Sequence, residues 1–140
     1  MSVCTFFGHR DCPPDIRPRL REVLVDLIEH RSVELFYVGN KGAFDRLVRS
    51  VLRELSQEYP QVRYAVVLER MPGKQQGEDC SDTLLPEEIE DGPPRFAIAR
   101  RNRWMLRQAD CVVTYITRSR GGAAQFAALA ERQKKTVIRL

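Results

Sequence analysis

The sequence predicts an α/β domain in which a mostly parallel sheet of about five strands lies between two layers of helices. Short apolar segments alternate with amphipathic helical segments along almost the whole chain, and this alternation is typical of such a fold. The apolar segments have consecutive apolar residues, as expected of strands that are covered on both faces. With 140 residues the chain is long enough for one domain with its own core, and we expect a single domain over residues 1–140.

The first half of the chain contains three predicted strands and two helices. The first strand runs from Val3 to Phe7 and stops at Gly8. The helix after it has one apolar face, made by Ile16, Leu20, Val23, Leu24, Leu27 and Ile28. A second strand is predicted from about Val33 to Val38. Gly42 opens a helix with the cleanest apolar face in the chain: Phe44, Leu47, Val48, Val51, Leu52 and Leu55. A third strand follows from Val62 to Leu68.

The second half begins with a long segment, 70–94, rich in Gly, Pro and acidic residues, which predicts a functional or mobile loop. Its acidic run at 86–91 favours a solvated segment over a metal site. A helix is then predicted from Arg95 to Ala109, with the polar Asn102 on its apolar face. The remaining predicted elements are a strand at 111–116, a small-residue helix at 123–133 and a strand that begins at Thr136.

Composition narrows the function classes. Apolar and charged fractions of 43% and 30% are typical of a globular protein, and the chain has no apolar run long enough to span a membrane and no signal peptide pattern, so we expect a cytoplasmic protein. The net charge is +4, but basic and acidic residues interleave, which disfavours nucleic acid as a partner. The four cysteines have no paired spacing, and we expect no metal site.

Three predicted strands end in glycine and polar residues. Gly8 is followed by His9 and Arg10, Gly39 by a polar pair, and the strand at 111–116 by Ser119-Arg120-Gly121-Gly122. The carboxyl ends of parallel strands meet at one edge of a sheet, where such folds bind ligands. Glycines before helices leave backbone N–H groups that favour an anion, so a phosphate-bearing nucleotide is the expected occupant.

Side chains near these tips supply charge and hydrogen bonds: His9, Arg10, Lys41, Arg101 and Asn102. No dinucleotide fingerprint and no phosphate-loop motif is present. Two plainer interpretations therefore stay open. The glycines could serve turn geometry alone, and Asp45 could simply stabilise the first turn of its helix.

Four segments together resemble the SLOG superfamily, most closely its small YpsA-like branch. They are Thr5–Arg10, Phe36–Asp45, Arg101–Met105 and Gly121–Ala123. The resemblance implies a Rossmann-like fold that binds a nucleotide or nucleotide-derived ligand, more as a sensor than as a conventional enzyme, with no obligatory cofactor. By analogy it also implies a homodimer. The ligand-binding residues it predicts, together with the strand-tip pattern, are Gly8, His9, Arg10, Gly39, Asn40, Lys41, Gly42, Phe44, Asp45, Arg101, Asn102, Ser119, Gly121, Gly122 and Ala123.

The resemblance implies two further functions. Lonely-guy phosphoribohydrolases of the superfamily cleave nucleoside monophosphates and have the signature PGGxGTxxE. Here Arg101 resembles the family's helix arginine, but Arg120 replaces the proline and Ala128 stands at the acidic position, where Asp45 would have to substitute. The resemblance therefore implies Asp45 and Arg101 as catalytic candidates. The DNA-processing protein A family binds single-stranded DNA, which needs a basic groove and exposed aromatic side chains. Trp104 and Tyr115 are the candidates for that role.

Overall fold

The computed structural model describes residues 2–69, 83–90 and 92–140 and has the predicted α/β architecture. Its sheet is parallel and has the strand order β4-β3-β2-β1-β5-β6. The sheet thus has six strands, one more than predicted. The strands are β1 (Ser2–Gly8), β2 (Val33–Val38), β3 (Arg63–Val67), β4 (Thr83–Leu84), β5 (Cys111–Tyr115) and β6 (Thr136–Arg139).

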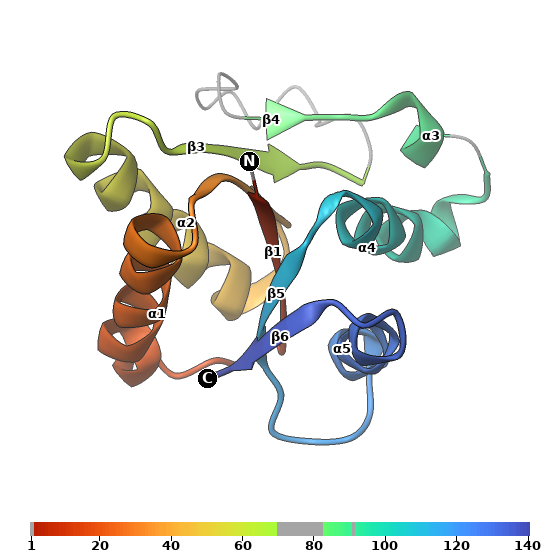
Figure 1. The fold of residues 1–140 in the computed structure, drawn as a ribbon. Helices are drawn as coiled ribbons and strands as arrows, with labels where there is room; N and C mark the ends of the chain where they lie inside the picture. The colour runs from red at the N-terminus through yellow and green to blue at the C-terminus, as the bar shows by residue number, and fades with distance from the viewer. Residues whose placement is uncertain (1, 70–82, 91) are drawn as a thin grey trace.

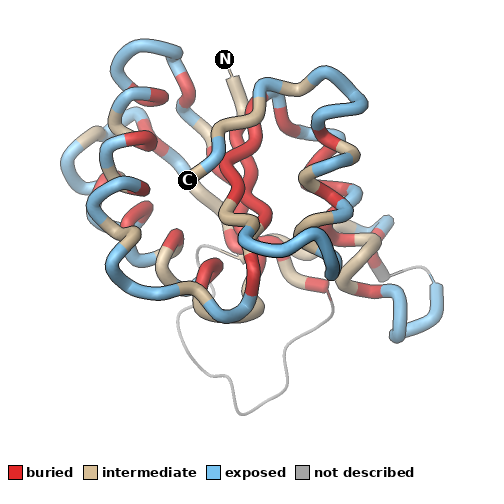
Figure 2. Tube along the Cα trace, turned by 90° about the horizontal axis from the view of Figure 1, so that it is seen from below, coloured by how far each residue is buried: buried red, intermediate tan, exposed pale blue. Residues whose placement is uncertain are grey.

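Two helices cover each face of the sheet (Figure 1). On one face lie α1 (Arg17–His30) and α2 (Gly42–Glu58), and on the other lie α4 (Ala97–Gln108) and α5 (Gly122–Arg132). Short 3-10 turns at Pro14–Ile16 and Pro94–Phe96 precede α1 and α4. Figure 2 shows the buried residues gathered in the central strands and on the inner sides of these helices. No helix in the described part of the chain is long and apolar enough to cross a membrane.

Successive side chains of β1 explain its uninterrupted apolar sequence. Phe6 belongs to the core beneath α1 and α2 and stacks on Phe36 with 6.1 Å between ring centroids. Phe7 points to the opposite face and stacks on Phe126 of α5 at 5.4 Å. Because adjacent residues of a strand face opposite sides of the sheet, a strand between two helical layers needs apolar residues at both.

The chain reverses its direction of winding next to β1. Within the sheet, β2 and β3 are added on one side of β1, and the chain later returns to add β5 and β6 on the other side of β1. Gly8, the last residue of β1, pairs with Tyr115, the last residue of β5. In open α/β sheets this reversal creates a crevice at the carboxyl ends of the strands.

Part of the predicted loop at 70–94 is regular. Residues 83 and 84 form the edge strand β4, and α3 (Glu87–Glu90) forms one helical turn. Ile89 is buried against α4, and its carbonyl accepts a hydrogen bond from Arg100 Nε at 2.8 Å. Elements of two and four residues are too short for a periodic pattern, which is why the prediction missed them. Residues 70–82 and 91 of the predicted loop lie outside the described residues.

Candidate functional site

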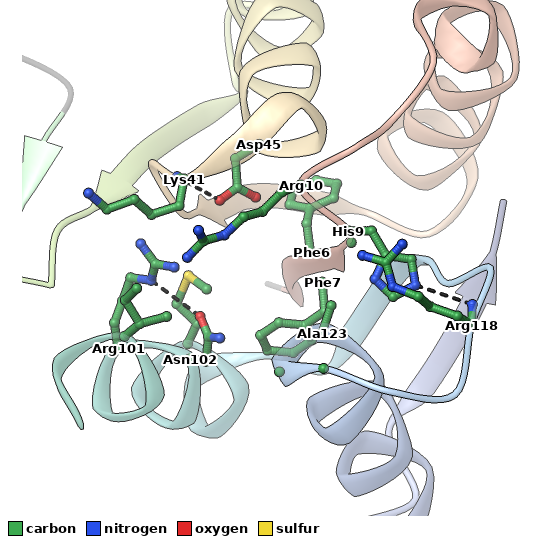
Figure 3. Close-up of a pocket in the computed structure, with 15 residues that line it drawn as sticks. Phe6, Phe7, His9, Arg10, Lys41, Asp45, Arg101, Asn102, Arg118 and Ala123 are labelled. Atoms are coloured by element: carbon green, nitrogen blue, oxygen red, sulfur yellow. Dashed lines mark hydrogen bonds between the residues drawn. The ribbon is translucent and has the colours of Figure 1, made fainter. Parts of the chain in front are cut away.

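A pocket of about 230 Å³ lies at the carboxyl ends of β1 and β5 (Figure 3). Most of the predicted site residues line it: Gly8, His9, Arg10, Lys41, Asp45, Arg101, Asn102, Gly121, Gly122 and Ala123. These residues come from the ends of β1 and β2, from the first turn of α2, from α4 and from the amino end of α5. Segments far apart in the sequence therefore meet around one cavity, as the glycine-bearing strand tips predicted.

The other predicted residues lie outside the lining of this pocket. Phe44 is fully buried in the core, where its ring occupies the space that a Cβ on Gly8 would need. Gly39 leaves space for the side chains of Asp45 and Arg101, and Gly42 leaves space for Arg10. Ser119 lines a separate groove between α5 and β6. Asn40 contributes indirectly, because its Oδ1 accepts a hydrogen bond from Arg101 Nη1 at 2.6 Å.

One wall of the pocket contains a buried network of charges. Arg101, Asp45 and Glu69 are all buried, and no other Asp, Glu, Lys or Arg in the described part of the chain is. Glu69 Oε1 lies 3.1 Å from Lys41 Nζ, and Glu69 Oε2 lies 3.6 Å from Arg101 Nη1. A buried charge is tolerated only when it is paired. The network therefore fixes the guanidinium of Arg101 in place.

Asp45 is the unusual member of this network. Its Oδ2 accepts a hydrogen bond from the Lys41 backbone N–H at 3.1 Å. Burial raises the pKa of Asp45 to about 6, although the nearby Arg101 guanidinium opposes the rise. The same burial lowers the pKa of Arg101, again opposed by Asp45. Gly39 makes this arrangement feasible, since a Cβ there would lie 2.6 Å from Asp45 Oδ2.

The amino terminus of α2 is closed to a ligand at two of its amides. The Lys41 N–H is used by Asp45, and the Ala43 N–H donates to the Arg10 carbonyl at 2.8 Å. Gly42 has φ +87°, and a Cβ there would lie 2.7 Å from the Arg10 Cα. The loop after β1 is thus docked on the start of α2. The N–H groups that the sequence predicted to be free for an anion are partly occupied here.

The amino terminus of α5 is open. Gly121 adopts φ +100°, and no heavy atom lies within 4 Å of a Cβ built on Gly121 or Gly122. Gly122 and Ala123 line the pocket, and no side chain caps this helix. First-turn N–H groups have no partner within their own helix. Within the described residues, the first-turn N–H groups of α5 are therefore the backbone donors that an anion in the pocket can reach.

Two arginines complete the lining. The Arg10 side chain projects into the pocket (Figure 3), and within the described residues it has no hydrogen bond or ion pair. Arg118 pairs with Asp11 through two hydrogen bonds of 3.1 Å. The Arg118 backbone N–H donates to His9 Nε2 at 3.4 Å, so His9 presents an acceptor nitrogen to the loop.

The sequence interpretation missed five lining residues: Phe6, Phe7, Ile98, Met105 and Arg118. Ile98 and Met105 share a helical face with Arg101 and Asn102, at spacings of three and four, so the periodicity of α4 could have found them. Arg118 belongs to an irregular loop, where no periodic signal exists.

Of the two aromatic candidates for stacking, Trp104 is buried and Tyr115 is half-buried, and each packs against another ring. Trp104 is buried edge-on against Tyr37 at 5.0 Å, and Tyr115 stacks on Phe44 at 6.2 Å. In the described part of the chain, the exposed large apolar side chain is Phe96, which is 49% exposed at the start of α4. The guanidinium of the adjacent Arg95 lies 4.8 Å from its ring centroid. Among the described residues, Phe96 is therefore the aromatic side chain that is open to a stacking base.

Comparisons with known proteins give a fold relationship. The sequence matches no family model, and no curated protein matches it at a significant level. Among solved structures, the chain is similar to DNA processing protein A from Helicobacter pylori, described for its binding of single-stranded DNA, with a TM-score of 0.69 and 14% identity. The likeness covers 99% of this chain and 64% of that protein, so the chain spans less than two thirds of its length.

This likeness corrects one prediction. The interleaved charges were interpreted as evidence against a nucleic-acid partner, but a protein that binds single-stranded DNA has the same fold over nearly the whole chain. The argument from charge pattern was wrong because it searched for a dense basic block. The cations of this pocket come instead from four separate segments, at Arg10, Lys41, Arg101 and Arg118. At 14% identity the comparison itself establishes the Rossmann-like α/β fold alone.

Proposed function

We propose that the pocket binds the phosphate group of a nucleotide that forms part of single-stranded DNA. The observation that carries the proposal is one cavity that holds both the open amino terminus of α5 and the guanidinium of Arg10, which has no hydrogen bond or ion pair with the described residues. A guanidinium and free helix N–H groups are the two donors that best match phosphate oxygens. Both are in place before any ligand arrives.

The charge balance supports an anionic ligand. Four Lys and Arg side chains line the pocket against one carboxylate, Asp45. Two further carboxylates nearby neutralise two of these cations: Asp11 pairs with Arg118, and Glu69 pairs with Lys41. The remaining excess is one positive charge, because Asp45 lies beside Arg101 and Arg10 has no acidic partner among the described residues. A cleft with an excess of one sign of charge concentrates ligands of the opposite sign. Phosphodiesters carry one negative charge per nucleotide at all physiological pH values.

Two observations favour DNA as the source of the phosphate. One is the likeness of the fold to a protein that binds single-stranded DNA. The other is the exposed pair Arg95 and Phe96, two residues before Ile98 of the pocket lining, which offers a surface on which a neighbouring base can stack. The pocket volume suits one phosphate with its sugar, because pockets for whole drug-sized ligands are roughly 300–1,000 Å³.

A free nucleotide is the second candidate. The sequence motifs that resemble the SLOG superfamily support it, and we propose membership of that superfamily on those motifs. Asp45 also offers a carboxylate at the pocket, which a hydrolase acting on nucleoside monophosphates would need. DNA and a free nucleotide present the same phosphate chemistry, so one experiment with two ligands separates them.

The test is fluorescence anisotropy with a labelled dT12 strand between 50 and 300 mM KCl, and competition with unlabelled dTMP and AMP. We expect dT12 to bind with an affinity that falls as salt rises. Arg10→Gln should weaken binding by about 10- to 100-fold, the loss of a charge-assisted hydrogen bond. Arg53→Gln, which removes an exposed charge from α2 away from the pocket, should change it about twofold or less.

Three outcomes decide between the alternatives. Arg10-dependent binding of dT12 that mononucleotides displace only at high concentration supports the DNA proposal. Tight Arg10-dependent binding of AMP or dTMP, with dT12 no better, favours the free nucleotide, and released base detected by chromatography would identify a hydrolase. Equal effects of Arg10→Gln and Arg53→Gln, or no binding at low salt, overturn the assignment of the pocket.

A further inference from the structure

Two thiols meet at the amino edge of the sheet, at the opposite ends of the strands that form the pocket. Cys4 of β1 and Cys111 of β5 are register partners in neighbouring parallel strands. Their sulfur atoms lie 3.5 Å apart, and both cysteines are free. We propose that Cys4 and Cys111 form a redox-active dithiol that a small peroxide converts into a disulfide between the strands.

The backbone geometry permits the bond. Neighbouring strands lie about 4.7–4.9 Å apart, which falls inside the range of about 4.4–6.8 Å between the Cα atoms of disulfide-bonded cysteines. An S–S bond of about 2.05 Å requires the two sulfurs to approach by about 1.5 Å. Rotation of two side chains can supply this, because the residues are already opposite each other.

The two cysteines differ in access. Cys111 lines an open pocket of about 310 Å³ together with Arg31 and Asp110. Cys4 is fully buried, with 0% exposure against 7% for Cys111. A small oxidant can therefore reach Cys111 first, while Cys4 is held behind it. This is the arrangement of an attacking thiol and a resolving thiol.

The electrostatics agree with that division. The hydrogen bond between the two thiols lowers the pKa of Cys111, and the positive charge of Arg31 adds to the effect. Burial raises the pKa of the Cys4 thiol well above its ordinary value. Cys111 is thus the more acidic thiol of the pair and the one that loses its proton first.

The reaction balances with hydrogen peroxide as the oxidant. The Cys111 thiolate attacks one peroxide oxygen, the O–O bond breaks, and the departing hydroxide takes a proton to give water. The Cys4 sulfur then attacks the sulfenic sulfur of Cys111, so that an S–S bond forms and the S–O bond breaks. The Cys4 proton leaves with the released hydroxide as a second water. Two thiols are oxidised, and one peroxide is reduced.

The experiment uses the full chain with Cys12→Ser and Cys80→Ser, which leaves only the proposed pair. After treatment with hydrogen peroxide, we expect the intact mass to fall by two hydrogen atoms and the count of free thiols to fall from two to none. Peptide mapping without reduction should recover a peptide that joins Cys4 to Cys111. A reducing agent should restore both thiols.

Single variants assign the roles. With Cys4→Ala, Cys111 should accumulate as sulfenic acid, which a dimedone probe traps; with Cys111→Ala, Cys4 should resist the peroxide. Accumulation of sulfinic acid on Cys111 while Cys4 is present and free overturns the proposal. So does a pair that stays reduced under conditions that oxidise Cys12 in the native sequence. Both contrary results are measured in proteins that retain Cys4 and Cys111, so they do not depend on a variant that folds.

Discussion

The pocket is bounded by two helices that begin alike in sequence and differ in structure. Both α2 and α5 follow a strand tip and start at a glycine. At α2 the backbone amides are used within the protein, and a buried network of Asp45, Glu69 and Arg101 lies beside them. At α5 the first amides face the open pocket, and none of the described residues packs against its glycines. We call the first side of the pocket, with Gly42, Asp45, Glu69 and Arg101, the α2 wall, and the second, with Gly121, Gly122 and Ala123, the α5 wall. The α2 wall stabilises the fold, and the α5 wall is available for a ligand.

The difference teaches that a glycine before a helix has two possible meanings. Gly42 is needed because the loop containing Arg10 packs against it and because its φ is positive. Gly122 has neither constraint, so its lack of a side chain leaves room in the pocket. Substitutions on the α2 wall should therefore change stability, and those on the α5 wall should change binding.

The largest effect is expected for Arg101→Gln. This change leaves Asp45 and Glu69 buried beside a neutral side chain, and breaking a buried charge pair costs about 3–5 kcal/mol. Urea denaturation monitored by circular dichroism measures the free energy of unfolding. Arg103→Gln, at an exposed position of the same helix, is the matched control and should stay within about 0.5 kcal/mol of the native protein. Equal losses in both variants would contradict a structural role for the α2 wall.

A pair of glycine substitutions compares the two walls directly. Gly42→Ala should destabilise by about 2 kcal/mol or more, because alanine disfavours a positive φ and its Cβ would collide with the Arg10 backbone. Gly122→Ala meets no atom within 4 Å and should be within about 0.5 kcal/mol of neutral. Thermal melts of the two variants provide the measurement. If Gly122→Ala lost as much stability as Gly42→Ala, the amino terminus of α5 would be packed against other atoms, contrary to this account.

Asp45 should make the free energy of unfolding depend on pH. Its pKa in the folded protein is about 6, above the ordinary value of 3.8, so the folded state holds this proton more tightly than the unfolded state. Stability contributed by the proton is present at low pH and is lost as pH rises from about 4 to 6, by about 3 kcal/mol at most. Asp45→Asn should lack this loss.

The check is the difference in unfolding free energy between the native protein and Asp45→Asn, measured from pH 4 to pH 7. Other carboxylates titrate in both proteins and cancel in the difference. Asparagine can still accept the hydrogen bond from the Lys41 N–H. A difference that does not change across this range would mean that Asp45 titrates normally.

Most of the fold could be predicted from the sequence, because apolar spacing determines strands and helices of ordinary length. The shared edge for Gly8, Gly39 and Gly122 followed from the rule that parallel strands align their carboxyl ends. Two things could not be predicted. The docking of the Arg10 carbonyl on the Ala43 N–H is a contact between distant residues with no sequence pattern. The place of Arg118 in the pocket is the other, because Arg118 lies in an irregular loop, whereas Arg10, Lys41 and Arg101 were among the predicted site residues.

The central claim is that the open α5 terminus and Arg10 together receive a phosphate. Titration of the isotope-labelled protein with dT12, followed by amide chemical shifts, tests it most directly. We predict that the amides of Gly122 and Ala123 shift strongly and saturably, whereas those of Lys41 and Ala43, which are already hydrogen-bonded, shift little. Saturable shifts confined to the α2 terminus or to the amino edge of the sheet would contradict the account.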